Sequence, residues 1–293
     1  MSVETTVIIP TYNRPERLAD CLAALMRAVG ASVEVVVVDD GGSADLAPVV
    51  ARYPSARLIR QSNAGPAAAR NLGAEVARGE FLVFTDDDCL PAAGWLEALI
   101  GACRRSRDAL VGGSVRNILS DNPYSAASQA LCDFLLLFFE KRPSAMAFFT
   151  SNCIACSRAT YLALGGFDTR FPLAAAEDRD LGMRWRASGR PMVFVREAVL
   201  GHSHHLTLSS FVRQHATYGR GARHLHRIMR ERGQSPIKFE VSGFHLQLLL
   251  HPFQARSRQP VRQAALLVLS QAAMVYGYVS EMLRSGQDAT TLA

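Results

Sequence analysis

Four short apolar runs, each followed by a helical pattern, restrict the folds open to the first 104 residues. The runs are TTVIIP (5–10), VEVVVVDD (33–40), ARLIRQ (56–61) and EFLVFT (80–85). The segments after them are predicted to be helices at about 15–29, 44–52, 66–77 and 92–104. Apolar runs that alternate with helices are typical of a parallel sheet covered on both faces. The predicted fold class is therefore α/β, with a doubly wound, mainly parallel sheet.

Polar residues follow these predicted strands at the points where the strands end. They are Thr11, Tyr12 and Asn13; Asp39 and Asp40; Gln61, Ser62 and Asn63; and Asp86, Asp87 and Asp88. Because ligands of such sheets bind outside the carboxyl ends of the strands, we expect these groups to share one rim. Two acidic clusters on one rim repel each other, and a bound cation or a donor-rich ligand would relieve that repulsion.

The triplet Asp86–Asp88 is the clearest candidate for metal binding. In an extended chain, Asp86 and Asp88 point to the same side. Paired carboxylates suit Mg²⁺ or Mn²⁺, which often share their ligands with a substrate diphosphate. The alternative is a solvated acidic turn before a helix that starts near Pro91, because a helix N-terminus also favours acids. The residues alone leave both interpretations open.

Other candidates have ordinary structural alternatives. Asp39 and Asp40 can accept hydrogen bonds from a base or a ribose, or form an Asx turn. Arg70 can reach a phosphate or form a surface salt bridge. Glu177 and Asp178 open a predicted helix, where a carboxylate serves either as a general base or as part of a common N-terminal pattern.

Histidines and cysteines give weaker signals. His202, His204 and His205 follow a late apolar strand, and a histidine near an acidic rim is a candidate metal ligand. Cys153 and Cys156 form a C-x-x-C pair without a second pair, so we assign them to core packing. The six cysteines are expected to be reduced thiols of a cytosolic protein. The first residues, MSVETTVIIPTYNR, lack a basic n-region and are not expected to be a secretory signal.

Residues 206–293 are predicted to form a basic and apolar helical extension. From His202 to Arg262 there are ten Arg or Lys residues and two acids, whereas the whole chain has a net charge of +6. This segment is a solvated face or a site for anionic lipid, a phosphorylated substrate or nucleic acid. Nucleic acid is disfavoured because regular aromatic interleaving is missing.

The apolar stretch Ala264–Leu283 raises the question of a membrane-spanning helix. The polar or small residues in and around it fall on one helical face: Gln263, Ser270, Gly277, Glu281 and Arg284. Such a stripe favours a helix docked on protein or lying in a membrane interface over one that spans the bilayer.

Taken in order, these segments resemble family-2 glycosyltransferases of the GT-A fold. The matching motifs cover about Val3 to His205 and read VIIPTYNRPERL, VVVVDDGGS, NAGPAAARNLG, FLVFTDDDCLPAAGWL, SNCIACSR, LGGFDTRF, AEDRDLGMRW and GHSHH. The resemblance implies a GT-A catalytic domain at 1–205, with a nucleotide-sugar-binding half at 1–104 and an acceptor-binding half at 105–205. It also implies an inverting transfer from a nucleotide-diphosphate sugar, with a UDP-sugar favoured.

The same resemblance implies roles for individual residues on the donor side. The residues expected to bind the nucleotide sugar are Pro10, Tyr12, Arg14, Asp39, Asp40, Arg70, Asp86 and Asp87, with Arg70 approaching the diphosphate. The residues expected to hold Mn²⁺ or Mg²⁺ are Asp86, Asp88 and His202. Among the histidines, His202 is preferred because it lies 24 residues after the expected base.

On the acceptor side, the resemblance makes Asp178 the general base and lets Glu177 position the acceptor. Asn152 occupies an acceptor-binding position, although the residue before it is Ser151. The acceptor is expected to be a carbohydrate, a lipid-linked molecule or a small molecule, as in polysaccharide or cell-envelope synthesis. The C-terminal helices are expected to meet a membrane surface, which would place a cytoplasmic protein at the inner face of the cell membrane.

Two other functions remain open for such a sheet. A sugar-nucleotide pyrophosphorylase would carry a Gly-rich N-terminal loop, and PTYNRPERL has no glycine. A non-catalytic module that binds sugar nucleotides or membranes would have no need to combine Asp86, Asp88 and Asp178.

Overall fold

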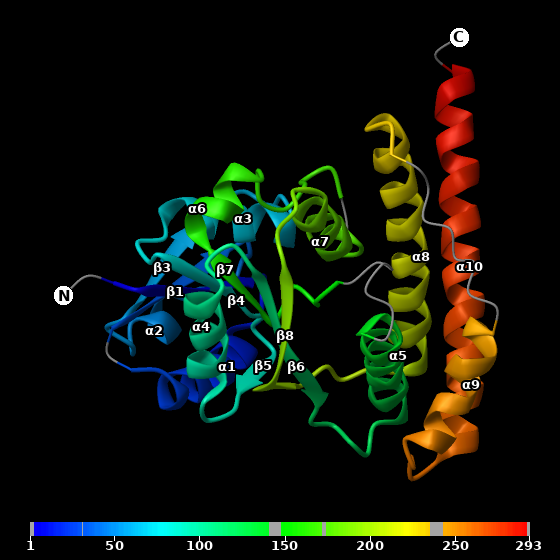
Figure 1. Ribbon diagram of the computed structural model, residues 1–293, viewed down its shortest axis with the longest axis horizontal. Coiled ribbons are helices and arrows are strands. Elements are labelled where there is room, and N and C mark those ends of the chain that lie inside the picture. Colours follow the sequence, from blue (N-terminus) through cyan, green and yellow to red (C-terminus); the bar gives the residue numbers. More distant parts are fainter. Residues whose placement is uncertain (1–2, 31, 141–147, 172–173, 235–242, 292–293) are drawn as a thin grey trace. The chain divides into compact units, whose positions relative to one another are not determined.

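A computed structural model of the chain describes residues 3–30, 32–140, 148–171, 174–234 and 243–291, with the backbone alone at 285–291. In this part of the chain, one sheet has the strand order β3-β2-β1-β4-β7-β6-β8-β5 (Figure 1). The strands are β1 Thr5–Thr11, β2 Val33–Asp39, β3 Ala56–Arg60, β4 Phe81–Phe84, β5 Cys89–Pro91, β6 Leu110–Asn117, β7 Ile154–Ser157 and β8 Met192–His202. The helices are α1 Pro15–Ala28, α2 Ala47–Val50, α3 Pro66–Val76, α4 Trp95–Arg105, α5 Pro123–Glu140, α6 Arg158–Ala163, α7 Glu177–Ala187, α8 Leu208–Glu231, α9 Phe244–Gln254 and α10 Pro260–Thr291.

The sheet is mixed and mostly parallel, as predicted. β1 pairs in parallel with β2 and β4, β2 with β3, and β6 with β8. β7 runs antiparallel between β4 and β6, and β5 runs antiparallel to β8. In the register of the first two strands, Thr11 lies beside Asp39, so both strands deliver their carboxyl ends to the same edge.

Helices cover both faces of the sheet. Successive side chains of a strand point to opposite faces, so the apolar strands present side chains for packing on both sides. On one face, Val7 and Val35 join the buried core formed with α1 and α4. On the other face, α3 approaches so closely that a Cβ atom on Gly73 would lie 2.5 Å from the Cγ2 atom of Ile8. The doubly wound prediction is therefore confirmed.

Two predicted helix boundaries differ from the structure. The helix predicted at 92–104 begins only at Trp95, because Cys89–Pro91 forms β5 and Gly94 takes a positive φ of 77°. The helix predicted at 44–52 shrinks to α2, where the Asp45 side chain accepts a hydrogen bond from the Ala47 amide. In both places the apolar pattern is compatible with a longer helix, but a local turn delays the start of the helix.

The chain folds as two compact units. Unit 1 contains the whole sheet with α1 to α4, α6, and α7 from Asp178 onward. Unit 2 contains α5, α8, α9 and α10. The sequence analysis grouped the α5 segment with the acceptor-binding half, whereas in the structure α5 belongs with the C-terminal helices.

Unit 2 is a small helical assembly with its own apolar contacts. Phe244 of α9 packs edge-on against Phe134 and Phe138 of α5, with ring centroids 5.3 and 5.0 Å apart. α8 begins with a capping box between Thr207 and Ser210. α10 then lies along α8, as the sequence predicted for a docked helix.

Candidate active site

The acidic triplet Asp86–Asp88 lies in a turn between β4 and β5. The Cys89 amide donates a hydrogen bond to the Asp86 carbonyl oxygen over 3.1 Å, which closes the turn. The extended geometry used in the sequence analysis is therefore wrong here, because the chain reverses after β4. As a result, the three carboxylates meet three different sets of partners.

Each carboxylate of the triplet meets an arginine from a distant part of the chain. The Arg70 Nη2 atom lies 2.6 Å from Asp86 Oδ1. The Nη1 atoms of two α1-side arginines reach the other two acids: Arg14 lies 3.1 Å from Asp87 Oδ1, and Arg17 lies 3.2 Å from Asp88 Oδ2. These contacts resolve the like-charge repulsion within the triplet.

Asp87 is held most deeply of the three. Its side chain is nearly fully buried and accepts a 2.7 Å hydrogen bond from the Thr11 hydroxyl at the end of β1. Burial raises the pKa of Asp87 to about 6, while the Thr11 hydrogen bond and the charge of Arg14 act against this rise. Asp87 thus ties the triplet to the first strand and to Arg14, both predicted parts of the donor site.

Asp88 and His202 come together through strand pairing. In the register of β5 and β8, Cys89 lies opposite His202, and the His202 Nε2 atom is 3.3 Å from Asp88 Oδ1. Ligand atoms of Asp88, Cys89 and His202 all lie within 4.8 Å of one another. Burial raises the pKa of the Cys89 thiol well above its usual range.

A carboxylate oxygen suits Mn²⁺ or Mg²⁺ and an imidazole nitrogen is a common metal ligand, whereas a cysteine sulfur is softer than these ions prefer. Asp88 and His202 therefore fit a divalent ion. Asp86, the other predicted ligand, is not part of this group and meets Arg70 instead.

Asp39 and Asp40 organise the loops after β2. The Asp39 carboxylate accepts a 2.9 Å hydrogen bond from the Gly42 amide, three residues on, so it holds the loop after β2 by a longer span than the Asx turn considered from the sequence. Asp40 accepts from the Gln61 side chain and from the amides of Ala64 and Gly65, at 2.7 to 2.9 Å. Both carboxylates thus have structural partners within the rim where the sequence expects a nucleoside.

Three further predicted residues lie around this rim. Pro10 is buried near the end of β1, opposite Val38, and Tyr12 beyond the strand leaves 48% of its surface exposed. Asn152 is buried beside Cys89, and its Nδ2 atom lies 3.6 Å from the Cys89 sulfur. The Oδ1 atom of Asn152 has no hydrogen-bond partner among the described residues. This oxygen is available to accept a hydrogen bond from a ligand.

Arg70 links the acidic turn to α7. Only 3% of its surface is exposed, which excludes the surface salt bridge considered as its alternative role. Its guanidinium pairs with Asp86 and lies 5.5 Å from the centre of the Phe167 ring. Its charge also acts on Asp178. One buried arginine thus connects a predicted donor-side acid with the predicted base.

Asp178 and Glu177 open α7, as the sequence predicts. The residue before them, Ala176, has a φ of 74°, which is rare for a residue with a side chain. Burial raises the pKa of Asp178 above its usual range, and the charges of Arg179 and Arg70 oppose this rise. Glu177 is almost fully buried. A carboxylate with a raised pKa accepts a proton more readily than a solvated one.

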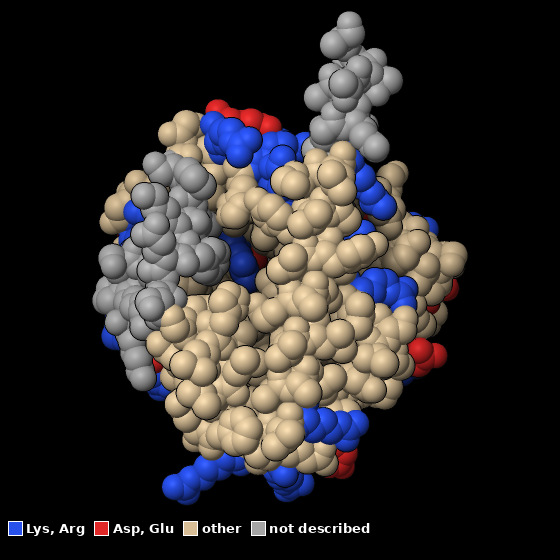
Figure 2. Space-filling model, turned by 90° about the vertical axis from the view of Figure 1, so that its right-hand side faces the viewer, with Lys and Arg blue, Asp and Glu red and all other residues tan. Residues whose placement is uncertain are grey.

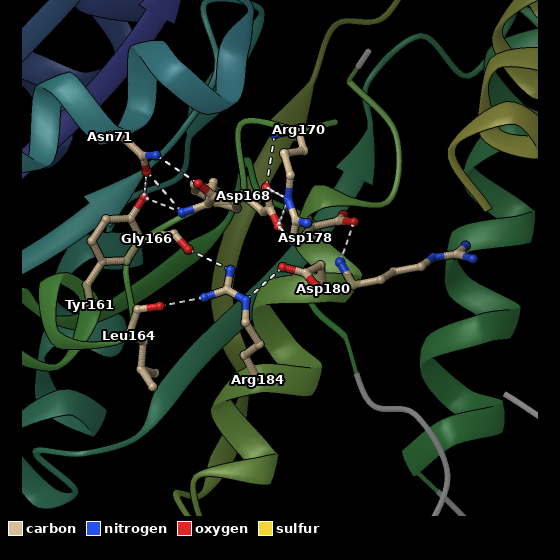
Figure 3. A network of polar contacts seen from close by, with 11 residues as sticks. Asn71, Tyr161, Leu164, Gly166, Asp168, Arg170, Asp178, Asp180 and Arg184 are labelled. Carbon is tan, nitrogen blue, oxygen red and sulfur yellow. Dashed lines mark hydrogen bonds and ion pairs between the residues drawn. The ribbon is translucent and has the colours of Figure 1, made fainter. Parts of the chain in front are cut away.

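A polar network holds the turn at residues 164–167, which lies between α3 and α7 (Figure 3). Asn71, next to Arg70 on α3, donates to the Phe167 carbonyl over 2.8 Å and accepts from the Tyr161 hydroxyl and the Phe167 amide over 2.6 and 2.9 Å. From the other side, Arg184 of α7 donates to the Leu164 and Gly166 carbonyls over 2.7 and 2.6 Å. The helices that carry Arg70 and Asp178 are therefore anchored to the same turn.

Replacing Asn71 with leucine is expected to lower the free energy of unfolding by about 3 kcal/mol, because buried polar groups of Tyr161 and Phe167 lose their partners. Thermal unfolding should fall by roughly 6 to 12 °C for a chain of this size. Glu75→Ala, on the exposed side of the same helix, is the matched control and should unfold like the parent protein. An unchanged unfolding temperature in Asn71→Leu would show that the network contributes little.

Two residues of this region were missed in the sequence analysis. Arg17 follows Arg14 by three positions in the first turn of α1, and i,i+3 spacing places both on one helical side. That spacing is the signal that identifies Arg17 as a second partner of the triplet. Asn71 offers no comparable signal, because its role depends on a turn almost a hundred residues away.

The C-x-x-C pair behaves as predicted. Cys153 is buried and lies 3.3 Å from the Trp95 indole nitrogen, and all six cysteines of the chain are free thiols. Burial raises the pKa of Cys153 to about 11. Both residues of the pair are therefore protonated core residues at neutral pH.

Known proteins resemble this chain in sequence and in fold. The sequence pattern of "Glycosyl transferase family 2" matches residues 6–162, just over half of the 293-residue chain. A pre-mycofactocin glycosyltransferase of Mycobacterium tuberculosis (strain CDC 1551 / Oshkosh) is 29% identical over 226 residues, which is 75% of this chain and 47% of that protein. The chain thus spans about half the length of this relative.

Solved structures show the same fold at low sequence identity. The mannosyltransferase PcManGT from Pyrobaculum calidifontis, solved with GDP-Man and Mn²⁺, is 22% identical, with a TM-score of 0.62 over 99% of this chain and 81% of that one. GalNAc-T7, solved with UDP, GalNAc and Mn²⁺, is 14% identical, with a TM-score of 0.55 over 87% of this chain and 58% of that one.

Proposed function

The chain belongs to glycosyl transferase family 2, and from this premise we propose that it transfers a sugar from a nucleoside-diphosphate sugar to an acceptor hydroxyl with inversion at the anomeric carbon. The observation that carries the proposal is Arg70, which pairs with Asp86 and whose charge also acts on Asp178. The acidic turn and the predicted base therefore belong to one electrostatic site. The family match ends at residue 162, so the roles of Asp178 and His202 depend on their geometry.

In the proposed reaction, Asp178 takes the proton of the acceptor hydroxyl. At the same time, the oxygen of that hydroxyl forms a bond to the anomeric carbon. The bond from that carbon to the diphosphate breaks, and the diphosphate leaves with the electron pair. Because the attack comes from the face opposite the leaving group, one displacement inverts the configuration. Burial raises the pKa of Asp178, which suits a group that must gain a proton during the reaction. Glu177, buried beside it, is the proposed positioning residue for the acceptor.

The proposed donor site lies along the rim formed by β1, β2 and the acidic turn. Tyr12 is exposed at this rim and is available to contact a base, while the loops held by Asp39 and Asp40 surround it. Arg14 and Arg70 supply positive charge for a diphosphate. The two solved neighbours contain GDP-Man or UDP, which supports a nucleoside-diphosphate sugar as the class of donor. We favour a UDP-sugar.

Asp88 and His202 are the residues that would hold a divalent cation, and the Mn²⁺ in both solved neighbours supports this proposal. When bound, Mn²⁺ or Mg²⁺ would stabilise negative charge on the departing diphosphate. Asp86 is kept as a further candidate ligand. Asn152, beside Cys89 and with a free carbonyl oxygen, is the proposed acceptor-side hydrogen-bond acceptor.

Titration with UDP, GDP, CDP and dTDP, with and without Mn²⁺, tests the proposed function. A nucleotide at a hundred times its Kd is expected to raise the unfolding temperature by about 5 °C, because only the folded protein binds it. The shift should depend on Mn²⁺ and should be largest for one nucleotide. The corresponding monophosphates are the control, since they lack the second phosphate. If no diphosphate shifts the transition in the presence of Mn²⁺, the proposal is wrong.

A further inference from the structure

The exposed side of α10 is apolar along most of its length. Between Arg262 and Arg284, every exposed residue is apolar, and we call these residues the α10 stripe: Ala265, Val268, Ala272, Val275, Tyr276, Val279, Met282 and Leu283. Val275 and Tyr276 leave 63% and 71% of their surfaces exposed. The residues recur every three or four positions, so they form one continuous side of the helix.

The polar residues of α10 that lie between Arg262 and Arg284 are buried or partly buried. Ser270 is fully buried, and the Gln263 side chain donates a 2.9 Å hydrogen bond to the Ala126 carbonyl of α5. Glu281 pairs with His224 of α8 over 3.3 Å. A helix on the surface of a water-soluble protein has the opposite arrangement, with its apolar side inward. Gln263, Ser270, Gly277 and Glu281 of the predicted polar stripe therefore lie on the docked side, whereas Arg284 is exposed.

α9 adds to the apolar surface of unit 2. Its exposed large apolar residues Leu246, Leu250 and Phe253 follow one another by four and three positions, so they share one side of the helix. Figure 2 views the side on which α9 and α10 lie, and it shows a broad area with few charged side chains. An apolar area of this extent marks an interaction surface.

The charges around this surface are almost all positive. Arg256, Arg258 and Arg262 are exposed where α9 leads into α10, and Arg284 is exposed after the α10 stripe. The only acid in the sequence from 244 to 284 is Glu281, which faces α8. An apolar surface with arginines at its ends complements a bilayer that contains anionic headgroups.

We propose that the exposed apolar side of α9 and α10 binds an anionic lipid bilayer, with α10 lying in the plane of the membrane. The arginines meet the headgroups, and the α10 stripe with Leu246, Leu250 and Phe253 enters the boundary of the acyl chains. This inference is independent of the proposed transfer reaction, because none of these residues belongs to the candidate active site.

α8 argues against the alternative in which α10 crosses the membrane. By length and composition, the segment Pro260–Arg284 is long and apolar enough to do so, and it is the one such helix in the described residues. However, the backbones of α8 and α10 are in close contact, since a Cβ atom on Gly277 would lie 1.9 Å from the Ala216 carbonyl oxygen. α8 would enter the bilayer together with α10, and it carries five arginines: Arg213, Arg220, Arg223, Arg227 and Arg230. Burying these charges in hydrocarbon is costly.

Flotation of the full chain with phosphatidylcholine vesicles, with and without phosphatidylglycerol, tests this proposal. The parent protein is expected to float with the anionic vesicles. The variant Val268→Gln/Val275→Gln should bind them at least about tenfold more weakly, because two apolar side chains no longer leave water. Both positions are exposed, so the fold should persist, and Val279→Gln/Met282→Gln provides a second, independent pair. Leu162→Gln/Leu208→Gln is the matched control, with exposed apolar residues outside α9 and α10, and it should bind like the parent.

Further measurements distinguish an in-plane membrane helix from a spanning helix and from a dimer interface. Arg256→Gln/Arg258→Gln should weaken binding to the anionic vesicles severalfold, and added salt should weaken binding by the parent protein. Membrane-bound protein should be released by alkaline carbonate, and retention would instead show a spanning helix and overturn the in-plane arrangement. Parent protein that fails to float, or that floats equally well with both stripe variants, would overturn the proposal. The proposal would also be overturned if the parent protein formed a dimer in the absence of lipid and the stripe variants were monomers. In that case the apolar surface would bind a second copy of the chain.

Discussion

Asp178→Asn is expected to lower kcat by about 10² to 10⁴-fold, which is the usual contribution of a positioned general base. Asparagine has nearly the same shape as aspartate, but it does not take the proton of the acceptor hydroxyl. The Kd of the donor nucleotide should change little, because Asp178 is proposed to act on the acceptor. Transfer is measured with a saturating nucleotide sugar, and donor binding is measured by calorimetry on the same sample.

The matched control for this variant is Glu75→Gln, which removes an exposed carboxylate of unit 1 and should leave kcat unchanged. The pH profile provides a second readout. Burial raises the pKa of Asp178, so its ionised form is lost as the pH falls through that raised value. In the parent protein, the acidic decline of kcat should therefore begin at a higher pH than for a solvated aspartate. Full activity of Asp178→Asn would remove this residue as the base.

Asp88→Asn is expected to weaken Mn²⁺ binding at least about tenfold and to lower kcat/KM by about 100-fold or more. The physical reason is the loss of the charged oxygen that lies 3.3 Å from His202 Nε2. Mn²⁺ affinity is measured by calorimetry in the presence of the diphosphate that binds best. His202→Ala should weaken the same affinity, because it removes the proposed nitrogen ligand.

Asp20→Asn, on the exposed side of α1, is the control for charge alone and should retain the parent affinity. Asp86→Asn distinguishes between two arrangements of the triplet. A loss equal to that of Asp88→Asn would make Asp86 a direct ligand, as the sequence motif predicts. A parent-like Mn²⁺ affinity in Asp88→Asn would contradict the proposed metal site.

The first half of the sheet could be predicted from the sequence because its strands are continuous apolar runs. Val35 to Val38 are fully buried, and a run of this kind forms a strand covered on both faces. The register that puts Thr11 beside Asp39 then brings the strand ends to one edge without further information. This is why Asp39, Asp40 and the acidic triplet were recognised as parts of one rim.

The second half depends on long-range pairing, which local patterns do not report. The three-residue strand β5 exists because Cys89 pairs with His202 of β8, more than a hundred residues later. This pairing ends the extended chain at Asp86 and turns the three acids toward different partners. The sequence placed Arg70 near the diphosphate but did not predict its burial. That burial depends on the packing of Phe167 and on the turn held by Asn71.

The arginine partners of the acidic triplet have a consequence for how this protein is produced in a cell. Since Arg70, Arg14 and Arg17 already pair with Asp86, Asp87 and Asp88, we expect the chain to reach its folded state without a cation to hold the turn together. It differs in this respect from small zinc domains, in which metal binding supplies the free energy of folding. With the proposed metal site, metal scarcity would leave the amount of folded protein unchanged and would control only the fraction of it that carries a cation.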